Sequence, residues 1–296
     1  MSKKMKELAG GLRKKLAKSP AGVIRVLFQI AFFFLSPGLF ASAFGGVKSI
    51  AAAMGSGEAL ALSAHVTALI LLLSFTLLFG RVFCGYACSF GALGDAVYFL
   101  AGALLRRLGI KRFRKKPPRQ LRFVKYGVLL LLIILSAMGK QQFIHGVSPW
   151  NAFAQIVGGN IPPDSEYLVG CILLGVILIG MASTPRFFCR FLCPMGALFS
   201  ILPPALFVRL RKPKDASEKN KACGKCRLCS NQCPADLELA QQDAVTSGEC
   251  FSCCRCVDAC YQKKPKLSMF GLVSGTHDKM VVLGLILMGL VMLMDM

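Results

Sequence analysis

Several features that are common in enzymes are scarce or missing in this chain, and each absence narrows what the protein can do. Only 14 of the 296 residues are Asp or Glu, against 36 Lys or Arg, and only 3 are His. No glycine-rich phosphate loop and no nucleophile with an adjacent base is evident, which argues against nucleotide hydrolysis and nucleophilic catalysis. No carboxylate lies in the middle of the long apolar runs, which weakens the case for a transporter.

The composition combines two properties that seldom occur together in a soluble protein. The chain is 55% hydrophobic, yet its formal net charge is +22. Apolar spans that alternate with basic loops account for both properties. A basic chain can also bind nucleic acid, but here the basic residues cluster at the ends of apolar runs, where they set topology and contact anionic lipid. We therefore expect a membrane protein without a nucleic-acid partner.

Five apolar runs are long enough to cross a bilayer as helices. They cover residues 22–44, 58–80, 123–139, 166–183 and 279–295. Basic residues fill the N-terminal segment, the 106–125 loop and the segment after the fourth run, whereas loops 45–57 and 140–165 each hold one Lys. The positive-inside rule then predicts a multi-pass protein of the inner (cytoplasmic) membrane, with the N-terminus inside and the C-terminus outside. No cleavable signal peptide is expected, and the first run is interpreted as a retained span.

Eight cysteines form two runs with the same C-x2-C-x2-C-x3-C spacing. The first run is Cys223, Cys226, Cys229 and Cys233, and the second is Cys250, Cys253, Cys256 and Cys260. This spacing is typical of bacterial ferredoxins with two [4Fe–4S] clusters, in which each run supplies the fourth ligand of the other cluster. We therefore assign Cys223, Cys226, Cys229 and Cys260 to cluster one, and Cys250, Cys253, Cys256 and Cys233 to cluster two.

Two other uses of these cysteines are less favoured. Zinc also binds C-x2-C pairs, but it needs two pairs per ion rather than two matched quartets with a terminal x3 step. A disulfide framework conflicts with the reducing cytoplasm in which the segment is expected. Cys254 lies inside the second run but off its spacing, and we expect it to be a spare thiol.

The apolar part of the chain contains an internal duplication. Arg81-Val-Phe-Cys84-Gly-Tyr-Ala-Cys88-Ser-Phe-Gly-Ala-Leu93 aligns with Arg186-Phe-Phe-Cys189-Arg-Phe-Leu-Cys193-Pro-Met-Gly-Ala-Leu198. Each copy follows an outside-to-inside span and precedes an apolar interfacial helix, expected at 91–105 and 195–208. Both copies run in the same sense, so we expect a parallel repeat about an axis along the membrane normal.

The expected division of the chain follows from these features. It comprises a basic N-terminus (1–20), membrane repeat one (21–118), membrane repeat two (121–212), a two-cluster ferredoxin-like domain (213–266) and a C-terminal transmembrane helix (279–295). The fold class is thus an α-helical integral membrane protein with five transmembrane helices, four of them in the repeat, plus a small cytoplasmic domain.

Each copy of the duplicated motif carries a C-x3-C pair. On a helix, residues four apart share one face and lie roughly 5–6 Å apart. Two facing pairs would bring four thiols together, which predicts a further metal or iron–sulfur centre held by Cys84, Cys88, Cys189 and Cys193. Arg81 and Arg186 would offset the thiolate charge. Plain packing of small buried side chains, a thiol-redox pair and transient metal binding stay open as alternatives.

These motifs resemble the membrane polyferredoxins of the NapH/NosR type, the 4Fe–4S binding quinol dehydrogenase membrane subunit family. The resemblance covers about 21–260 and rests on the two C-x3-C motifs, the second followed by Pro194, ahead of two ferredoxin runs. It implies an iron–sulfur electron carrier in the membrane, linked to quinol or to flavin, haem or iron–sulfur partner proteins. Two features depart from the family: Ser89 stands where proline often follows the first motif, and the fifth span is an addition.

The function we expect is electron relay between cytoplasmic ferredoxin-type clusters and quinone or a membrane or outer redox partner. Such a chain is a redox subunit of an oxidoreductase complex rather than a stand-alone catalyst. In the loop 140–165, His145 could hydrogen-bond a quinone or ligate haem, and Trp150 is expected as an interfacial anchor beside a partner. The alternative is a metal-handling or assembly factor of the copper-reducing polyferredoxin kind.

Overall fold

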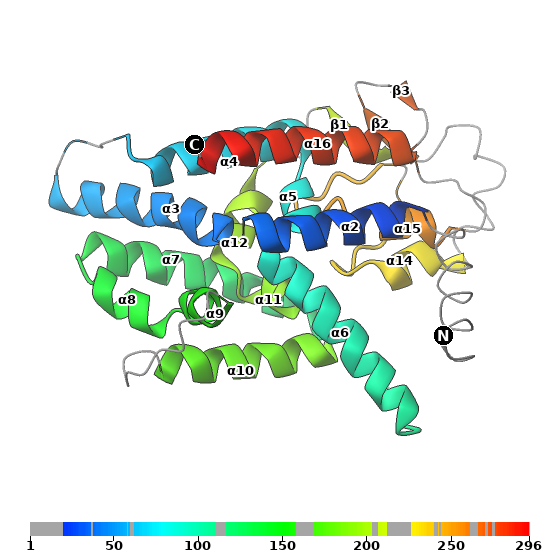
Figure 1. Cartoon of the computed structure of the whole chain (residues 1–296), viewed down its shortest axis with the longest axis horizontal. Coiled ribbons are helices and arrows are strands. Elements are labelled where there is room, and N and C mark those ends of the chain that lie inside the picture. The colour runs from blue at the N-terminus through cyan, green and yellow to red at the C-terminus, as the bar shows by residue number, and fades with distance from the viewer. Residues whose placement is uncertain are drawn as a thin grey trace, which may run out of the picture.

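The computed structural model describes most of the chain. It covers residues 20–36, 38–57, 59, 62–110, 117–157, 168–202, 207–211, 226–239, 242, 244–260, 266–269, 272–273 and 276–295. Within this part the protein is mostly helical, and the long helices run roughly side by side (Figure 1). Nearly all of the basic N-terminus and the ligand candidate Cys223 lie outside the described residues.

The first half of the helical part contains five helices in a fixed order. They are α2 (Pro20–Leu35), α3 (Leu39–Ser56), α4 (Ala64–Phe79), α5 (Val82–Tyr86) and α6 (Ser89–Arg107). α4 returns along α3, and α6 then slopes away from the other helices (Figure 1). α6 is the helix that the sequence predicted at 91–105, with two further residues at each end.

Among the described residues, the second half contains more elements, most of them short. They are η1 (Arg119–Phe123), α7 (Val124–Ala137), α8 (Gln141–Val147), α9 (Pro149–Val157), α10 (Leu168–Ser183), α11 (Phe187–Phe191) and α12 (Pro194–Ile201). The returning helix α10 corresponds to α4, and α11 and α12 correspond to α5 and α6. The helix expected at 195–208 ends at Ile201, because the sequence continues Leu202-Pro203-Pro204 and prolines cannot extend a helix.

The first expected span, 22–44, is not one helix. α2 ends at Leu35, α3 begins at Leu39, and the two axes are bent by 65°. The sequence explains the break, since Ser36 precedes Pro37 and the residue before a proline is disfavoured from helical conformation. The apolar stretch therefore continues in α3 as far as Ser56, well beyond the predicted end at 44.

Length and hydropathy single out few helices that could cross a membrane alone. Among the described residues one qualifies, Arg119–Ala137, and the bent pair Gly22–Leu35 with Leu39–Ser56 makes a second if it counts as one span. Three more helices are apolar but shorter: Ala64–Phe79, Leu168–Ser183 and Val281–Leu290 within α16 (Thr276–Asp295). Each of the five predicted runs thus contains apolar helix, and their role as five spans stays a prediction.

A small sheet, which the sequence analysis did not foresee, brackets the ferredoxin segment. β1 (Val208–Arg211) pairs antiparallel with β2 (Lys266–Met269), in a register from Val208 opposite Met269 to Arg211 opposite Lys266. β3 (Leu272–Val273) adds a third strand beside β2. The chain therefore enters the cysteine-rich segment through β1 and leaves it through β2, and β3 then precedes α16.

The cysteine-rich segment lies at one end of the helical part. Its two short helices, α14 (Leu228–Gln232) and α15 (Arg255–Asp258), pack against each other beside the N-terminal end of α2 (Figure 1). α16 runs back from this end, so the C-terminus points toward the opposite side (Figure 1). This arrangement separates the two cysteine runs from the turn between α3 and α4.

Candidate iron–sulfur site

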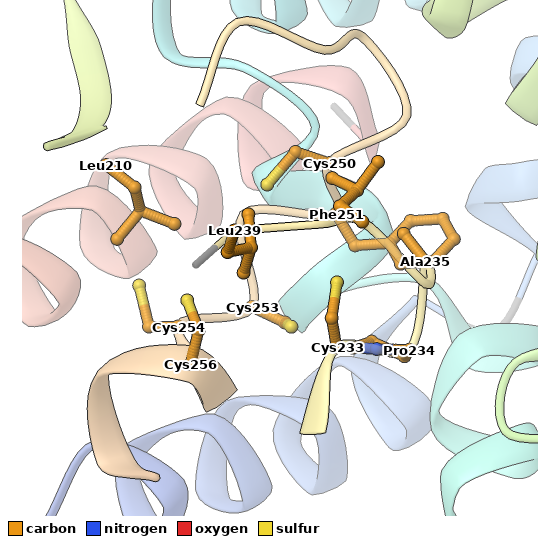
Figure 2. A pocket seen from close by; sticks show the side chains of 11 residues that line it. Leu210, Cys233, Pro234, Ala235, Leu239, Cys250, Phe251, Cys253, Cys254 and Cys256 are labelled. Atoms are coloured by element: carbon orange, nitrogen blue, oxygen red, sulfur yellow. The ribbon is translucent and has the colours of Figure 1, made fainter. Parts of the chain in front are cut away.

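A pocket in the cysteine-rich segment is lined by five thiols. They belong to Cys233, Cys250, Cys253, Cys254 and Cys256, and the walls are completed by Leu210, Pro234, Ala235, Leu237, Leu239 and Phe251. Figure 2 shows the sulfurs of Cys233 and Cys253 turned toward each other, with Cys254 and Cys256 on another side of the pocket. The structure thus brings together the four cysteines assigned to cluster two, including Cys233 from the other run.

Left-handed backbone turns shape both cysteine runs. Arg227 (φ 46°) and Cys254 (φ 54°) each follow the second cysteine of a run and cap the next short helix, and Ser252 (φ 49°) adds a further turn. Non-glycine residues in this region cost on the order of 1–3 kcal/mol, so the surrounding structure must stabilise them. The two runs therefore share one local geometry, as their equal spacing predicts.

Burial favours the protonated thiol at three of these cysteines, Cys233, Cys250 and Cys256. Burial raises the pKa of Cys250 to about 12 and that of Cys233 to about 11, and it raises the pKa of Cys256 well above the usual value. Iron takes thiolate ligands, so cluster assembly would displace these protons. A buried, apolar pocket of convergent thiols fits a [4Fe–4S] cluster, which supplies a one-electron carrier when bound.

Cluster one has a more exposed set of candidate ligands. Cys226 is exposed, and Cys229 and Cys260 are half-buried, whereas Cys253 and Cys256 of the second run are buried. The first run therefore lies toward solvent and the second toward the helical part.

The C-x3-C cysteines of both halves also converge. Cys84, Cys88, Cys189 and Cys193 are all buried, and Cys193 lies within electrostatic range of the other three. The expectation of one continuous helix under each pair was wrong, because α5 ends at Tyr86 and Cys88 is the extended N-cap residue of α6. Cys193 caps α12 in the same way, where Pro194 starts a new helix, so each pair spans a corner between two helices.

The four C-x3-C thiols do not surround a site for a single metal ion. Across the part of the chain that the structure describes, no group of three or more His, Cys, Asp or Glu side chains is placed to hold one metal ion. A cubane cluster carries its thiolates on four different irons, so its ligand sulfurs stand further apart than those around one ion.

Two buried arginines each donate hydrogen bonds from one half of the helical part to the other. Arg81, at the start of α5, donates to Ser200 Oγ (3.3 Å) on α12, and Arg186, before α11, donates to Asp95 (2.7 and 3.1 Å) on α6. Ser200 and Asp95 occupy matching places, each four residues after the glycine of the duplicated motif. The two contacts are therefore reciprocal, because the arginine of each half reaches the matching position in the other half.

The motif glycines leave room for these arginines. A Cβ on Gly91 would lie 2.6 Å from Arg186 Nη1, and a Cβ on Gly196 would lie 3.1 Å from Arg81 Nη2. A side chain at Gly91 would displace the guanidinium of Arg186, and one at Gly196 would crowd that of Arg81. The glycine of the duplicated motif thus has a physical reason.

Each arginine belongs to a largely buried group of one acid and two cations. Asp95 is paired with Arg186 (2.7 Å) and with Arg255 of the second cysteine run (2.6 Å). Burial alone would raise the pKa of Asp95, but the two guanidinium groups hold it below its usual range. Glu249, directly before Cys250, is paired with the fully buried Lys125 (2.6 Å) and more loosely with Arg81 (3.7 Å).

Phe251 lies where these groups meet. The guanidinium carbons of Arg81 and Arg186 lie 4.9 and 5.7 Å from the centroid of its ring, which is within the range of cation–π attraction. Its carbonyl oxygen lies so close to Gly85 that a Cβ there would approach it to 2.6 Å. The tip of the second cysteine run therefore lies against the junction of the two halves.

His145 and Trp150, the two candidates in the expected outer loop, are not equally well described by the structure. His145 lies in α8, and its side chain is outside the described residues. Trp150, on α9, is 6% exposed and packs edge-on against Phe40 (5.9 Å) and Phe44 (5.4 Å). It is a core residue and not the interfacial anchor that the sequence suggested, because the inward face of α9 places it among the rings of α3.

Asp95, Glu249 and Lys125 were not predicted from the sequence as site residues. A signal for the two acids was available, because the chain has only 14 acidic residues and each buried arginine needs a counter-charge. Asp95 lies within the stretch that follows the first duplicated motif, and Glu249 adjoins a cysteine ligand candidate. Nothing in the local sequence distinguishes Lys125 from the other basic residues of its loop.

Fold and site together define a helical, thiol-rich protein whose duplicated motif lies against a two-run ferredoxin segment. A family model described as a 4Fe-4S binding domain matches the chain twice, at residues 63–111 and 168–213. These segments run from α4 to α6 and from α10 to β1, so the same model recognises both halves. No solved structure matches the chain.

Relatives narrow the class further. An uncharacterized protein of Methanocaldococcus jannaschii, MJ0749, is 31% identical over 200 residues, which is 68% of each chain. The ferredoxin-type protein NapH of Haemophilus influenzae is 28% identical over 69% of this chain and 67% of its own. The regulatory protein NosR of Pseudomonas aeruginosa is 29% identical over 61% of this chain, which spans 24% of that longer protein. The chain belongs to the NapH/NosR-type membrane polyferredoxins, a family of ferredoxin-type electron-transport proteins.

Proposed function

We propose that this chain is a membrane-bound subunit that relays electrons between two cytoplasmic [4Fe–4S] clusters and quinone or a membrane or outer redox partner. The proposal retains five membrane spans and the division into two repeats, a ferredoxin-like domain and a last helix. It also retains a further centre at Cys84, Cys88, Cys189 and Cys193. The observation that supports it best is the position of Phe251, a wall residue of the thiol pocket whose ring lies against Arg81 and Arg186 and whose carbonyl lies against Gly85.

Shared cations support a path between the two groups of thiols. Arg81 lies within electrostatic range of Cys84 and Cys193 and also of Cys250. Arg186 has the same relation to Cys189 and to Cys253. A positive charge between two centres stabilises the reduced form of both, so these arginines would bring the two centres within reach of the same donor.

The exposure of the two cysteine runs supports an order of the centres along the path. The first run faces solvent, where a soluble partner could dock, and the second faces the helical part. Electrons would then pass between partner, cluster one, cluster two and the C-x3-C centre in that order or its reverse. The family model supports cluster binding at the last step, since its two matches cover both C-x3-C motifs.

Metal analysis of the anaerobically purified chain tests the proposal. Two ferredoxin clusters correspond to about eight iron and eight acid-labile sulfide per chain, and a further cubane raises each number to about twelve. We expect EPR of the reduced protein to show interacting clusters. Substituting Cys84 and Cys189 together by Ala should remove only the iron above eight. Zinc in place of iron, or disulfide-bridged thiols without metal, would refute the relay.

The copper-handling alternative rests on the same four buried thiols, because soft thiolates also select cuprous ion. It predicts stoichiometric copper on the purified chain and loss of a cuprous product in Cys84→Ser or Cys193→Ser variants. An iron content that depends on these cysteines, with no bound copper, favours relay.

A further inference from the structure

We propose that Cys254 is a reserve ligand of cluster two, able to hold the iron that Cys256 otherwise binds. The inference rests on the proposed second cluster. Five thiols line one pocket, whereas a cubane cluster takes four. The spacing of the second run accounts for four of them and leaves Cys254 without a role.

The position of the Cys254 thiol matches this role. Its side chain is 1% exposed, and Figure 2 shows its sulfur beside that of Cys256, with both side chains turned the same way into the pocket. The hydrogen bond that its thiol donates to Ser252 O is long, at 3.7 Å. A weakly bound thiol next to a ligand can reach the same corner of a cluster with little rearrangement.

The first run shows that the fold does not require a thiol here. Arg227 occupies the position of Cys254 between the second and third cysteines, adopts the same left-handed conformation and is exposed. A left-handed residue before a short helix is therefore compatible with a charged side chain. The buried Cys254 is a property of the second run alone.

Cys256 is the ligand that Cys254 can best replace. The two residues flank Arg255, whose guanidinium is held on Asp95 at 2.6 Å. With Arg255 anchored, a small rotation of the backbone on either side moves one sulfur toward the cluster and the other away. In the exchange the Cys254 thiol loses its proton and binds iron, while the released Cys256 thiolate takes up a proton. The cluster keeps four thiolates, and no electron is transferred.

Single and double substitutions of the full chain, prepared anaerobically, test the inference. Cys256→Ala should keep the wild-type iron and sulfide content, with an altered EPR spectrum of cluster two. Cys254→Ala should also keep it, whereas the double variant should lose about four iron. The matched control is Cys229→Ala, which removes the third cysteine of the first run. Because that run has Arg227 where the second run has Cys254, this variant should lose about four iron.

The outcomes separate this inference from the relay itself. Equal iron loss in Cys256→Ala and in the double variant would overturn the reserve role, and so would loss of iron in Cys254→Ala alone. Retention of cluster one in each second-run variant shows that the protein is folded. Wild-type protein with four iron or fewer would instead refute the second cluster on which the inference rests.

Discussion

The two halves of the helical part hold corresponding arginines, Arg81 and Arg186, in different electrostatic settings. On one side Arg186 is paired with Asp95, which belongs to the helical part, and the cysteine run adds the cation Arg255. On the other side the place of Asp95 is taken by Ser200, and the acid Glu249 comes from the cysteine run. The group around each arginine thus contains one acid and two cations. The ferredoxin segment supplies the cation Arg255 to the Arg186 group and the acid Glu249 to the Arg81 group.

This difference shows how a duplicated motif can bind an asymmetric partner segment. Without the cysteine run, the Arg186 side would be neutral and the Arg81 side would carry two uncompensated cations, Arg81 and Lys125. Glu249, which lies next to Cys250, offsets one of these two positive charges and pairs with both cations. The charge difference therefore orients the run, because only one orientation pairs every buried ion.

The largest effect should come from removing Arg186. In Arg186→Gln, Asp95 keeps the partly exposed Arg255 as its cation and the hydrogen bond that Gln29 Nε2 donates (3.0 Å). Breaking a buried ion pair typically costs about 3–5 kcal/mol. Arg81→Gln should cost clearly less, because Glu249 keeps Lys125 at 2.6 Å. Thermal unfolding of both variants in the same detergent measures the difference. Equal losses would mean that the two sides are equivalent after all.

The next largest effect concerns the Lys125–Glu249 pair. Glu249→Gln leaves the fully buried Lys125 ammonium and Arg81 without a full counter-charge, and we expect a loss of roughly 2–4 kcal/mol. The double variant Lys125→Met with Glu249→Gln should be more stable than Glu249→Gln alone, because no lysine charge stays buried. Limited proteolysis of the 212–265 segment, together with unfolding, measures the coupling. Strictly additive losses would contradict a direct pairing.

The smallest effect should distinguish the two motif glycines. Gly91→Ala places a methyl group 2.6 Å from Arg186 and 3.0 Å from the carbonyl of Cys84, whereas in Gly196→Ala the nearest contacts are at 3.1 Å. Overpacking of a buried site costs about 1–3 kcal/mol, so Gly91→Ala should fall near the top of this range and Gly196→Ala near the bottom. The difference in melting temperature checks the order, and Gly175→Ala, where a Cβ meets nothing within 4 Å, is the control.

Local patterns predicted much of the molecule. The apolar runs contain the long helices, and the matching cysteine spacing gives both runs the same left-handed turn before a short helix. The convergence of the C-x3-C thiols was predicted, but from a wrong premise, since Cys88 and Cys193 begin new helices instead of continuing old ones. Trp150 was misplaced for a related reason, because an aromatic residue in a loop sequence gives no sign of the helix that turns it inward.

The sequence by itself determined the features that depend on residues close together in the chain. These are the apolar runs that form helices, the turns at prolines, and the spacing that lets cysteines surround a cluster. The tertiary structure alone decided which charges meet. Arg186 pairs with a residue 91 positions away and Lys125 with one 124 positions away. No periodicity connects such residues, and only the packing of two half-units against a third segment brings them together. The physical reason is that burial makes each unpaired ion costly, so the fold selects the arrangement in which all of them find partners.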